Sequence, residues 1–191
     1  IPIRSDDPYH AYATSFLYNA QGEVVARYDK IHLFDAMVGE NRDTYTESAA
    51  TKPGTQPVVV DTPFGRLGMS VCYDLRFPEL YRRLSEAGAQ ILVVPSAFTE
   101  ITGKAHWEVL LRARAIENLC YVVAAAQGGY HVNGRTTYGH SMVVDYWGNI
   151  LNMREKGAGI VTASLDLASL EQQRKTFPVL SHRCSPERMR G

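Results

Sequence analysis

The sequence contains no long apolar run and no excess of charge of either sign. Its longest apolar stretches, 91–94 and 121–126, are far shorter than the roughly 20 residues that a membrane-spanning helix requires. Its 20 basic and 20 acidic residues cancel, so no overall field attracts nucleic acid or an anionic membrane surface. We therefore expect no membrane span and no nucleic-acid partner.

Cysteine is also scarce. Cys72, Cys120 and Cys184 are odd in number and far apart, unlike the cysteines of a disulfide-stapled secreted domain, so a cytoplasmic location is expected. No cysteine or histidine pair has zinc-ligand spacing, and no glycine-rich loop opens a helix. The sequence therefore predicts neither a metal nor a nucleotide cofactor.

The residues that are present indicate one α/β domain over 1–191, because this length and a hydrophobic content of 45% suffice for one core. Between Asp35 and Pro57 the chain is polar and without a clear period, which suggests a functional loop. Elsewhere, periodicity and turn residues predict strands that alternate with helices, as in layered α/β proteins. The expected strands are 12–18, 24–28, 58–60, a strand ending at Val71, 91–94, 121–126, 141–145, 149–153 and 159–165, and the expected helices are 78–87, 105–119 and 167–174.

The segment around Cys72 carries the clearest chemical signal. Cys72 follows an apolar, strand-like run and precedes a helix that Pro78 can begin, since proline fits the first helical turn. A thiol becomes reactive where a helix N-terminus or a cation favours the thiolate. This stretch alone supports two interpretations of Cys72 equally, a nucleophile or a small buried hydrophobic residue.

A nucleophilic Cys72 needs groups that stabilise an oxyanion and move protons. Lys30 is the best cationic candidate, with Glu47 as its partner carboxylate, and the backbone N–H of Tyr73 is a second oxyanion donor. A Cys–His dyad is the alternative. The sequence does not say which histidine would serve in it among His10, His32, His106, His131, His140 and His182.

Several segments, in this order along the chain, carry a resemblance to a known family. They are 28–34, 45–47, 71–80, 95–98, 106–108, 112–118 and 139–141. The most specific is 71–80, Val-Cys-Tyr-Asp-Leu-Arg-Phe-Pro-Glu-Leu. Together they resemble the nitrilase (carbon-nitrogen hydrolase) superfamily over essentially the whole chain, and within it the Nit-type ω-amidases and deaminated glutathione amidases.

The resemblance implies a Glu-Lys-Cys triad with a second, supporting glutamate. Cys72 matches the nucleophile, Lys30 the oxyanion-stabilising lysine and Glu47 the supporting glutamate. No residue matches the first glutamate, which serves as general base and acid. Because the sequence starts at Ile1 without a methionine, we expect the N-terminal part of the domain, with this glutamate, to be missing.

The fold implied by the resemblance is a four-layer α-β-β-α sandwich of the nitrilase type, lacking its first strands and helices. A homodimer or higher homo-oligomer is implied, formed through the helices after Cys72 and around Trp107, where Tyr81 and three arginines are expected to be exposed. Five residues flank the expected sheet ends and are candidates for substrate contact: Asp74, Arg76, Phe77, Phe98 and Thr99.

The implied function is that of a thiol hydrolase that cleaves the amide bond of a small linear ω-amide through a cysteine thioester. The implied small-molecule substrate bears a carboxylate, and deaminated glutathione is the family precedent. A second hypothesis comes from a different class, because the general base is unmatched. In that hypothesis the chain is a catalytically inactive truncated fragment or binding remnant.

Overall fold

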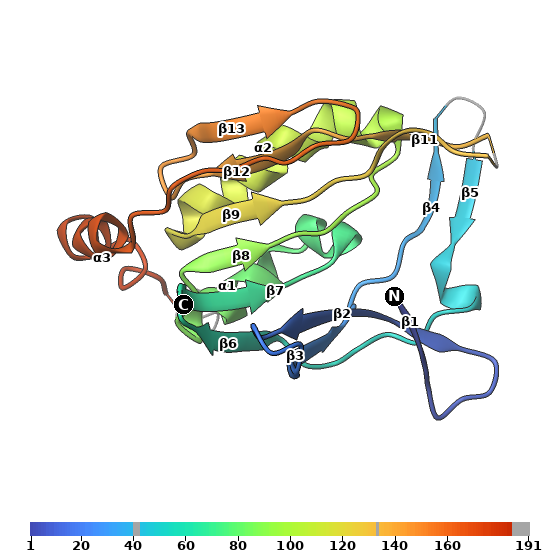
Figure 1. The fold of residues 1–191 in the computed structure, drawn as a ribbon, viewed down its shortest axis with the longest axis horizontal. Helices are drawn as coiled ribbons and strands as arrows, with labels where there is room; N and C mark the ends of the chain where they lie inside the picture. Colours follow the sequence, from blue (N-terminus) through green and yellow to red (C-terminus); the bar gives the residue numbers. More distant parts are fainter. Residues whose placement is uncertain (40–42, 133, 185–191) are drawn as a thin grey trace.

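A six-stranded sheet lies at the centre of the computed structural model, which describes residues 1–39, 43–132 and 134–184 (Figure 1). Its strand order is β13-β12-β9-β8-β7-β6. The inner strands β7, β8 and β9 are parallel, and the outer pairings are antiparallel. The bounds are β6 Val58–Thr62, β7 Gly65–Met69, β8 Ile91–Val93, β9 Tyr121–Ala124, β12 Ser141–Val144 and β13 Ile150–Arg154.

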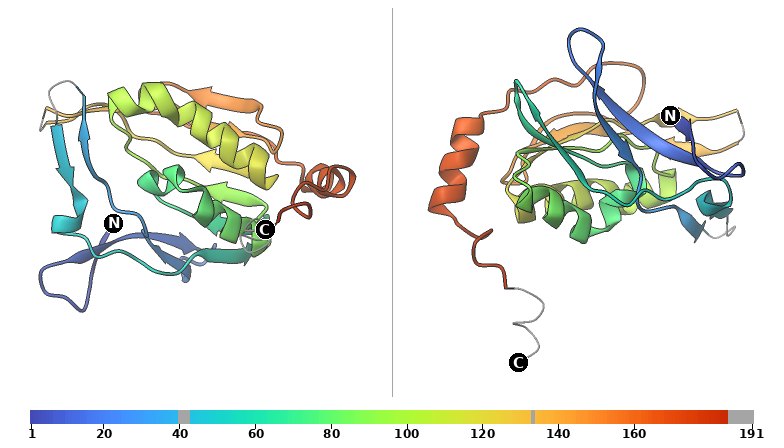
Figure 2. Two further views of the ribbon diagram at one scale, coloured as in Figure 1. Left: turned by 180° about the vertical axis from the view of Figure 1, so that it is seen from behind. Right: turned by 90° about the horizontal axis from the view of Figure 1, so that it is seen from below.

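Two helices, α1 (Pro78–Glu86) and α2 (Glu100–Asn118), cover one face of this sheet (Figure 2). Helix α1 begins at Pro78, as the sequence predicts. The expected start of α2 at Ala105 is wrong, because Thr99 caps the helix earlier: its hydroxyl accepts the N–H of Thr102.

A three-stranded antiparallel sheet lies on the other face of the central sheet, as the view from below shows (Figure 2). It consists of β1 (Pro2–Arg4), β2 (Ala11–Tyr18) and β3 (Val24–Asp29), and the predicted hairpin of β2 and β3 is confirmed. Tyr28 of β3 is fully buried in the main core. The described residues therefore form an α-β-β stack that agrees with the expected class of fold.

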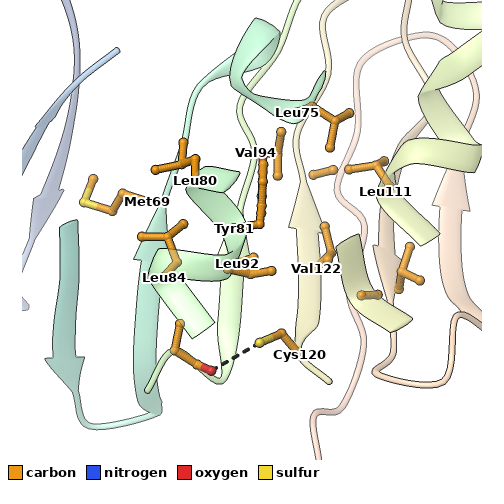
Figure 3. Close-up of a cluster of buried hydrophobic side chains, with 14 of the residues drawn as sticks. Met69, Leu75, Leu80, Tyr81, Leu84, Leu92, Val94, Leu111, Cys120 and Val122 are labelled. Atoms are coloured by element: carbon orange, nitrogen blue, oxygen red, sulfur yellow. Dashed lines mark hydrogen bonds between the residues drawn. The ribbon is translucent and has the colours of Figure 1, made fainter. Parts of the chain in front are cut away.

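A large part of the main core lies between the central sheet and the two helices (Figure 3). Leu84 of α1 and Leu111 of α2 meet Leu92 of β8 there, and all three are fully buried. Cys120 is also buried, as predicted, and donates its S–H to the carbonyl of Ala89. Burial raises the pKa of the Cys120 thiol to about 11, so this cysteine remains a protonated core residue at neutral pH.

Tyr81 differs from the sequence prediction. We expected an exposed side chain on α1, yet Tyr81 is fully buried and its hydroxyl lies 2.8 Å from Oγ of Ser70. The aromatic ring belongs to the core, and the serine satisfies the buried hydroxyl group.

Three further segments differ from the predicted elements. The polar stretch after Asp35 contains the paired strands β4 (Asp35–Val38) and β5 (Asp43–Thr46), followed by the 3-10 helix η1 (Glu47–Ala49). The glycines at 128 and 129 lie in strand β10 (Gly128–Tyr130), which pairs with β11 (Thr136–Tyr138). Segment 159–165 is not a strand, because its backbone pairs with no ladder and Asn152 instead donates to the carbonyl of Thr162.

The last helix, α3 (Leu167–Thr176), begins where the sequence predicts and extends slightly further. It lies at the edge of the molecule, away from β4 and β5 (Figure 1). None of the helices in the described ranges is both long and apolar enough to cross a lipid bilayer.

Candidate active site

A cavity of about 950 Å³ opens at the carboxyl ends of the parallel strands. The ends of β7, β8 and β9 point towards the paired strands β4 and β5 (Figure 1). Crevices at this edge of an α/β sheet commonly bind ligands. The cavity is lined from the sheet side by segments that follow these strands, 71–73, 95–99 and 125–127. Lys30, residues 44–47 and Arg135 line other parts of the wall.

Cys72 lies in this cavity on a tight connection, as the sequence predicts. It is the first residue of the 3-10 helix η2 (Cys72–Arg76), which follows the extended Val71 and precedes α1. Its φ of +49° is left-handed, a conformation that costs a residue other than glycine about 1–3 kcal/mol and is common at functional sites. The N–H of Cys72 donates to the carbonyl of Pro95 at 2.9 Å, which helps to hold the residue in this conformation.

Lys30 and Glu47 form an ion pair in the wall of the same cavity. The Lys30 side chain is only 4% exposed, whereas the Glu47 side chain is 24% exposed. The same Glu47 oxygen also accepts the backbone N–H of Phe34 at 2.6 Å. Glu47 thus ties the Lys30 ammonium group to the backbone at Phe34.

Tyr73 and Arg76 also line the cavity. Tyr73 is the second residue of η2, and the first N–H groups of a helix have no acceptor within it. The Arg76 guanidinium carbon lies 5.8 Å from the ring centre of Tyr73 and 5.2 Å from that of Phe98. Burial lowers the pKa of Arg76. The nearby Tyr73 and Cys72 act in the opposite direction, but burial is the larger effect. Phe98 and Thr99 complete this part of the wall.

Asp74 and Phe77 do not lie where the sequence led us to expect them. Asp74 is fully buried, and its two oxygens accept hydrogen bonds from Tyr28, Val71 and His32. Phe77 stacks on the His32 ring, with 3.8 Å between ring centres. Neither residue is part of the cavity wall, because Asp74 is buried in the core and Phe77 packs on His32.

None of the six histidines, all of which fall within the described ranges, lines the cavity that contains Cys72. His32 contacts Asp74, and His106 contacts the Arg76 guanidinium group at 3.2 Å. The arrangement therefore gives no geometric support to a Cys–His dyad. The described residues also contain no cluster of three histidine, cysteine or acidic side chains that could hold a metal ion.

Arg135 is a cavity residue that the sequence analysis missed. It lies between β10 and β11, and it donates to the carbonyl of Ala97 at 2.8 Å. Its guanidinium carbon is 5.6 Å from the ring centre of Tyr45, which also lines the cavity. No local signal marked this arginine, because it reaches the site only through the pairing of two short strands.

The chain is similar to known proteins in sequence and in fold. The family model for carbon-nitrogen hydrolase matches residues 1–175. A deaminated glutathione amidase from Yersinia enterocolitica is 48% identical over 180 residues, which make up 94% of this chain and 63% of that protein. The chain spans less than two thirds of the length of the first curated relatives that it matches.

The fold of the chain is similar to that of solved structures. The crystal structure of the C. elegans NitFhit protein matches with a TM-score of 0.86 and 49% identity, covering 93% of this chain and 44% of that one. A glutamate-to-glutamine mutant of an amidase from Nesterenkonia sp. AN1 matches with a TM-score of 0.74 and 32% identity, covering 93% of this chain and 64% of that one. Its structure shows covalent addition of the acetamide moiety of fluoroacetamide at the active-site cysteine.

Proposed function

The chain belongs to the carbon-nitrogen hydrolase family, and on this premise we propose that the intact protein hydrolyses small linear amides that bear a carboxylate. Its curated relatives named deaminated glutathione amidase support this class of substrate. Deaminated glutathione is itself the first compound to test. The nucleophile in this proposal is Cys72, and Lys30, Glu47 and the Tyr73 N–H are the supporting groups.

The proposed reaction proceeds in two steps. The Cys72 thiolate attacks the amide carbonyl carbon, and a C–S bond forms while the carbonyl oxygen takes the negative charge. The Lys30 ammonium group and the Tyr73 N–H stabilise this oxyanion. The C–N bond then breaks, and the nitrogen takes a proton and leaves as ammonia. Water hydrolyses the remaining thioester, which releases the carboxylic acid and restores the thiol.

One observation carries this proposal: Cys72 shares a cavity with a nearly buried lysine that forms an ion pair with a carboxylate. A lysine that is 4% exposed is not an ordinary solvated surface charge. At such a position water screens charges little, so a lysine ammonium group stabilises a developing negative charge more than it would at the surface.

The proton-transfer steps require a further group. Glu47 is the one carboxylate that lines the cavity among the described residues, and Lys30 and the Phe34 N–H already engage it. The resemblance implies a separate glutamate as general base, and no residue of this sequence matches it. We therefore propose that the intact protein supplies this glutamate from another part of its chain.

The proposal is tested by measuring ammonia release from a panel of linear amides, each compared with the matching nitrile. The panel should include amides with and without a carboxylate, and deaminated glutathione. We expect turnover of the carboxylate-bearing amides and an acyl adduct on Cys72, seen by mass spectrometry of the quenched reaction. Turnover of nitriles alone, or adducts confined to Cys120 or Cys184, would contradict the proposal.

Arg76 is the residue that we propose binds the substrate carboxylate. Three cations line the cavity, Lys30, Arg76 and Arg135, against the single carboxylate of Glu47. A guanidinium–carboxylate pair of this kind contributes about 1.5–3 kcal/mol, or about 10- to 100-fold in affinity. We expect Arg76→Met to raise KM for carboxylate-bearing amides by about that factor and to leave neutral amides nearly unchanged.

Arg83→Met is the matched control for this experiment. Arg83 lies on the exposed side of α1 and outside the cavity wall. The same chemical change there should leave KM unaltered for both kinds of amide. An equal rise of KM for charged and neutral amides in Arg76→Met would mean that Arg76 shapes the cavity and does not bind the substrate carboxylate.

The self-association implied by the resemblance stays a prediction. It is supported by apolar side chains on the outer side of α2, where Ile101, Val109 and Ile116 are all exposed. Their spacing places them on one face of the helix, so they form a stripe that a second copy could cover.

A further inference from the structure

Asp74 is a fully buried carboxylate that the proposed reaction does not use. Its Oδ2 atom accepts the Tyr28 hydroxyl at 2.7 Å and the Val71 N–H at 2.9 Å. Its Oδ1 atom lies 3.0 Å from the His32 backbone nitrogen and 2.7 Å from His32 Nδ1. A buried charge costs several kcal/mol unless hydrogen bonds satisfy it, and these contacts provide four donors when Nδ1 carries its proton.

The donors come from the two segments that carry the proposed catalytic groups. Tyr28 and His32 lie two residues before and two residues after Lys30, at the end of β3. Val71 and Asp74 itself lie on either side of Cys72. A single carboxylate therefore ties the Lys30 segment to the Cys72 turn, although the two segments are far apart in the sequence.

The contacts of Tyr28 and His32 make this connection stiff. The Tyr28 hydroxyl also accepts the N–H of Ile31 at 3.4 Å, so it holds the backbone next to Lys30. Burial is the main cause that raises the pKa of Tyr28, and its phenol stays protonated and donates to Asp74. His32 stacks almost parallel on Phe77, the residue that precedes α1.

We propose that Asp74 is a positioning residue that holds the Lys30 ammonium group at a fixed distance from the Cys72 sulfur. This inference rests on the proposed function, in which Lys30 and Cys72 act on the same carbonyl group. An error of about 1 Å in the placement of a catalytic group can cost on the order of 100-fold in rate. A buried carboxylate with donors on both segments prevents such an error.

The experiment removes one donor at a time in the intact protein, because Asp74→Asn would place an amide among these buried donors and disturb folding itself. Tyr28→Phe deletes the hydroxyl that connects Asp74 to the Lys30 side, and His32→Gln is the second variant on that side. The matched control is Tyr81→Phe. It deletes a hydroxyl of another fully buried tyrosine in the same core, one that contacts Ser70 rather than the Lys30 segment.

Two readouts separate positioning from stability. The first is kcat and KM for an amide substrate, and the second is the rate at which iodoacetamide alkylates Cys72 at neutral pH. We expect Tyr28→Phe to lower kcat by about 10- to 100-fold with KM within about threefold. We also expect it to change the alkylation rate in the same direction as Lys30→Met does. Tyr81→Phe should leave both readouts within about threefold of the wild type.

Each outcome decides the inference. If Tyr81→Phe lowers kcat as much as Tyr28→Phe does, the loss reflects core stability and the positioning role is refuted. If Tyr28→Phe and His32→Gln both behave as wild type, the role is refuted as well. If the wild-type protein hydrolyses no amide, the proposed function fails, but the alkylation rates still show whether Asp74 couples Lys30 to Cys72.

Discussion

Replacing Cys72 by serine is expected to abolish amide hydrolysis, with kcat/KM falling by about 10⁴-fold or more. Serine has nearly the shape of cysteine, so the turn into η2 and the cavity should be retained. The hydroxyl group is a far weaker nucleophile than a thiolate, and the cavity contains no histidine that could act as its base. The measurement is ammonia release together with the intact mass after incubation with substrate, which should show no covalent adduct.

The two remaining cysteines provide the controls for this variant. Cys184 is exposed, so Cys184→Ser should retain full activity. Cys120 is fully buried, so Cys120→Ala should lower thermal stability and leave kcat/KM of the folded protein unchanged. Residual activity of Cys72→Ser above about 1% of wild type would argue that another group attacks the carbonyl carbon.

The sequence predicts best those features that depend on neighbouring residues. Pro78 begins α1 because proline suits the first helical turn, and the apolar spacing around Trp107 identifies the buried side of α2. The turn that carries Cys72 is likewise a local signal, a strand followed closely by a helix start. The ion pair of Lys30 with Glu47 was predicted from charge and position, and the structure brings these two residues together.

The features that the sequence could not provide depend on contacts between distant segments. An aspartate two residues after a candidate nucleophile suggests a substrate contact until the donors of β3 and Val71 are found around it. Tyr81 similarly looks exposed until Ser70 is found beside its hydroxyl. Arg135 enters the cavity only because β10 pairs with β11. The role of each of these three residues follows from a contact with a segment that is distant in the sequence, and the sequence does not show such contacts.

Lys30→Met is expected to lower kcat/KM by about 10²- to 10³-fold, the loss that follows removal of one oxyanion-stabilising group. Methionine approximates the length and apolar stem of lysine, so it should fill the nearly buried position of Lys30 without a large void. Because the lost interaction forms with the oxyanion of the transition state, kcat should fall while KM changes little. Steady-state kinetics of the folded variant provide this comparison.

The same experiment separates the Lys30 proposal from the Cys–His alternative. Lys52→Met is the matched control, because Lys52 pairs with Asp6 outside the cavity wall and its side chain is 35% exposed. That change should leave kcat/KM unaltered, since an exposed ion pair contributes little even to stability. A dyad mechanism predicts the reverse pattern, in which Lys30→Met keeps its activity and one histidine substitution abolishes it. Because the cavity around Cys72 presents a lysine and no histidine, we expect the loss to follow Lys30.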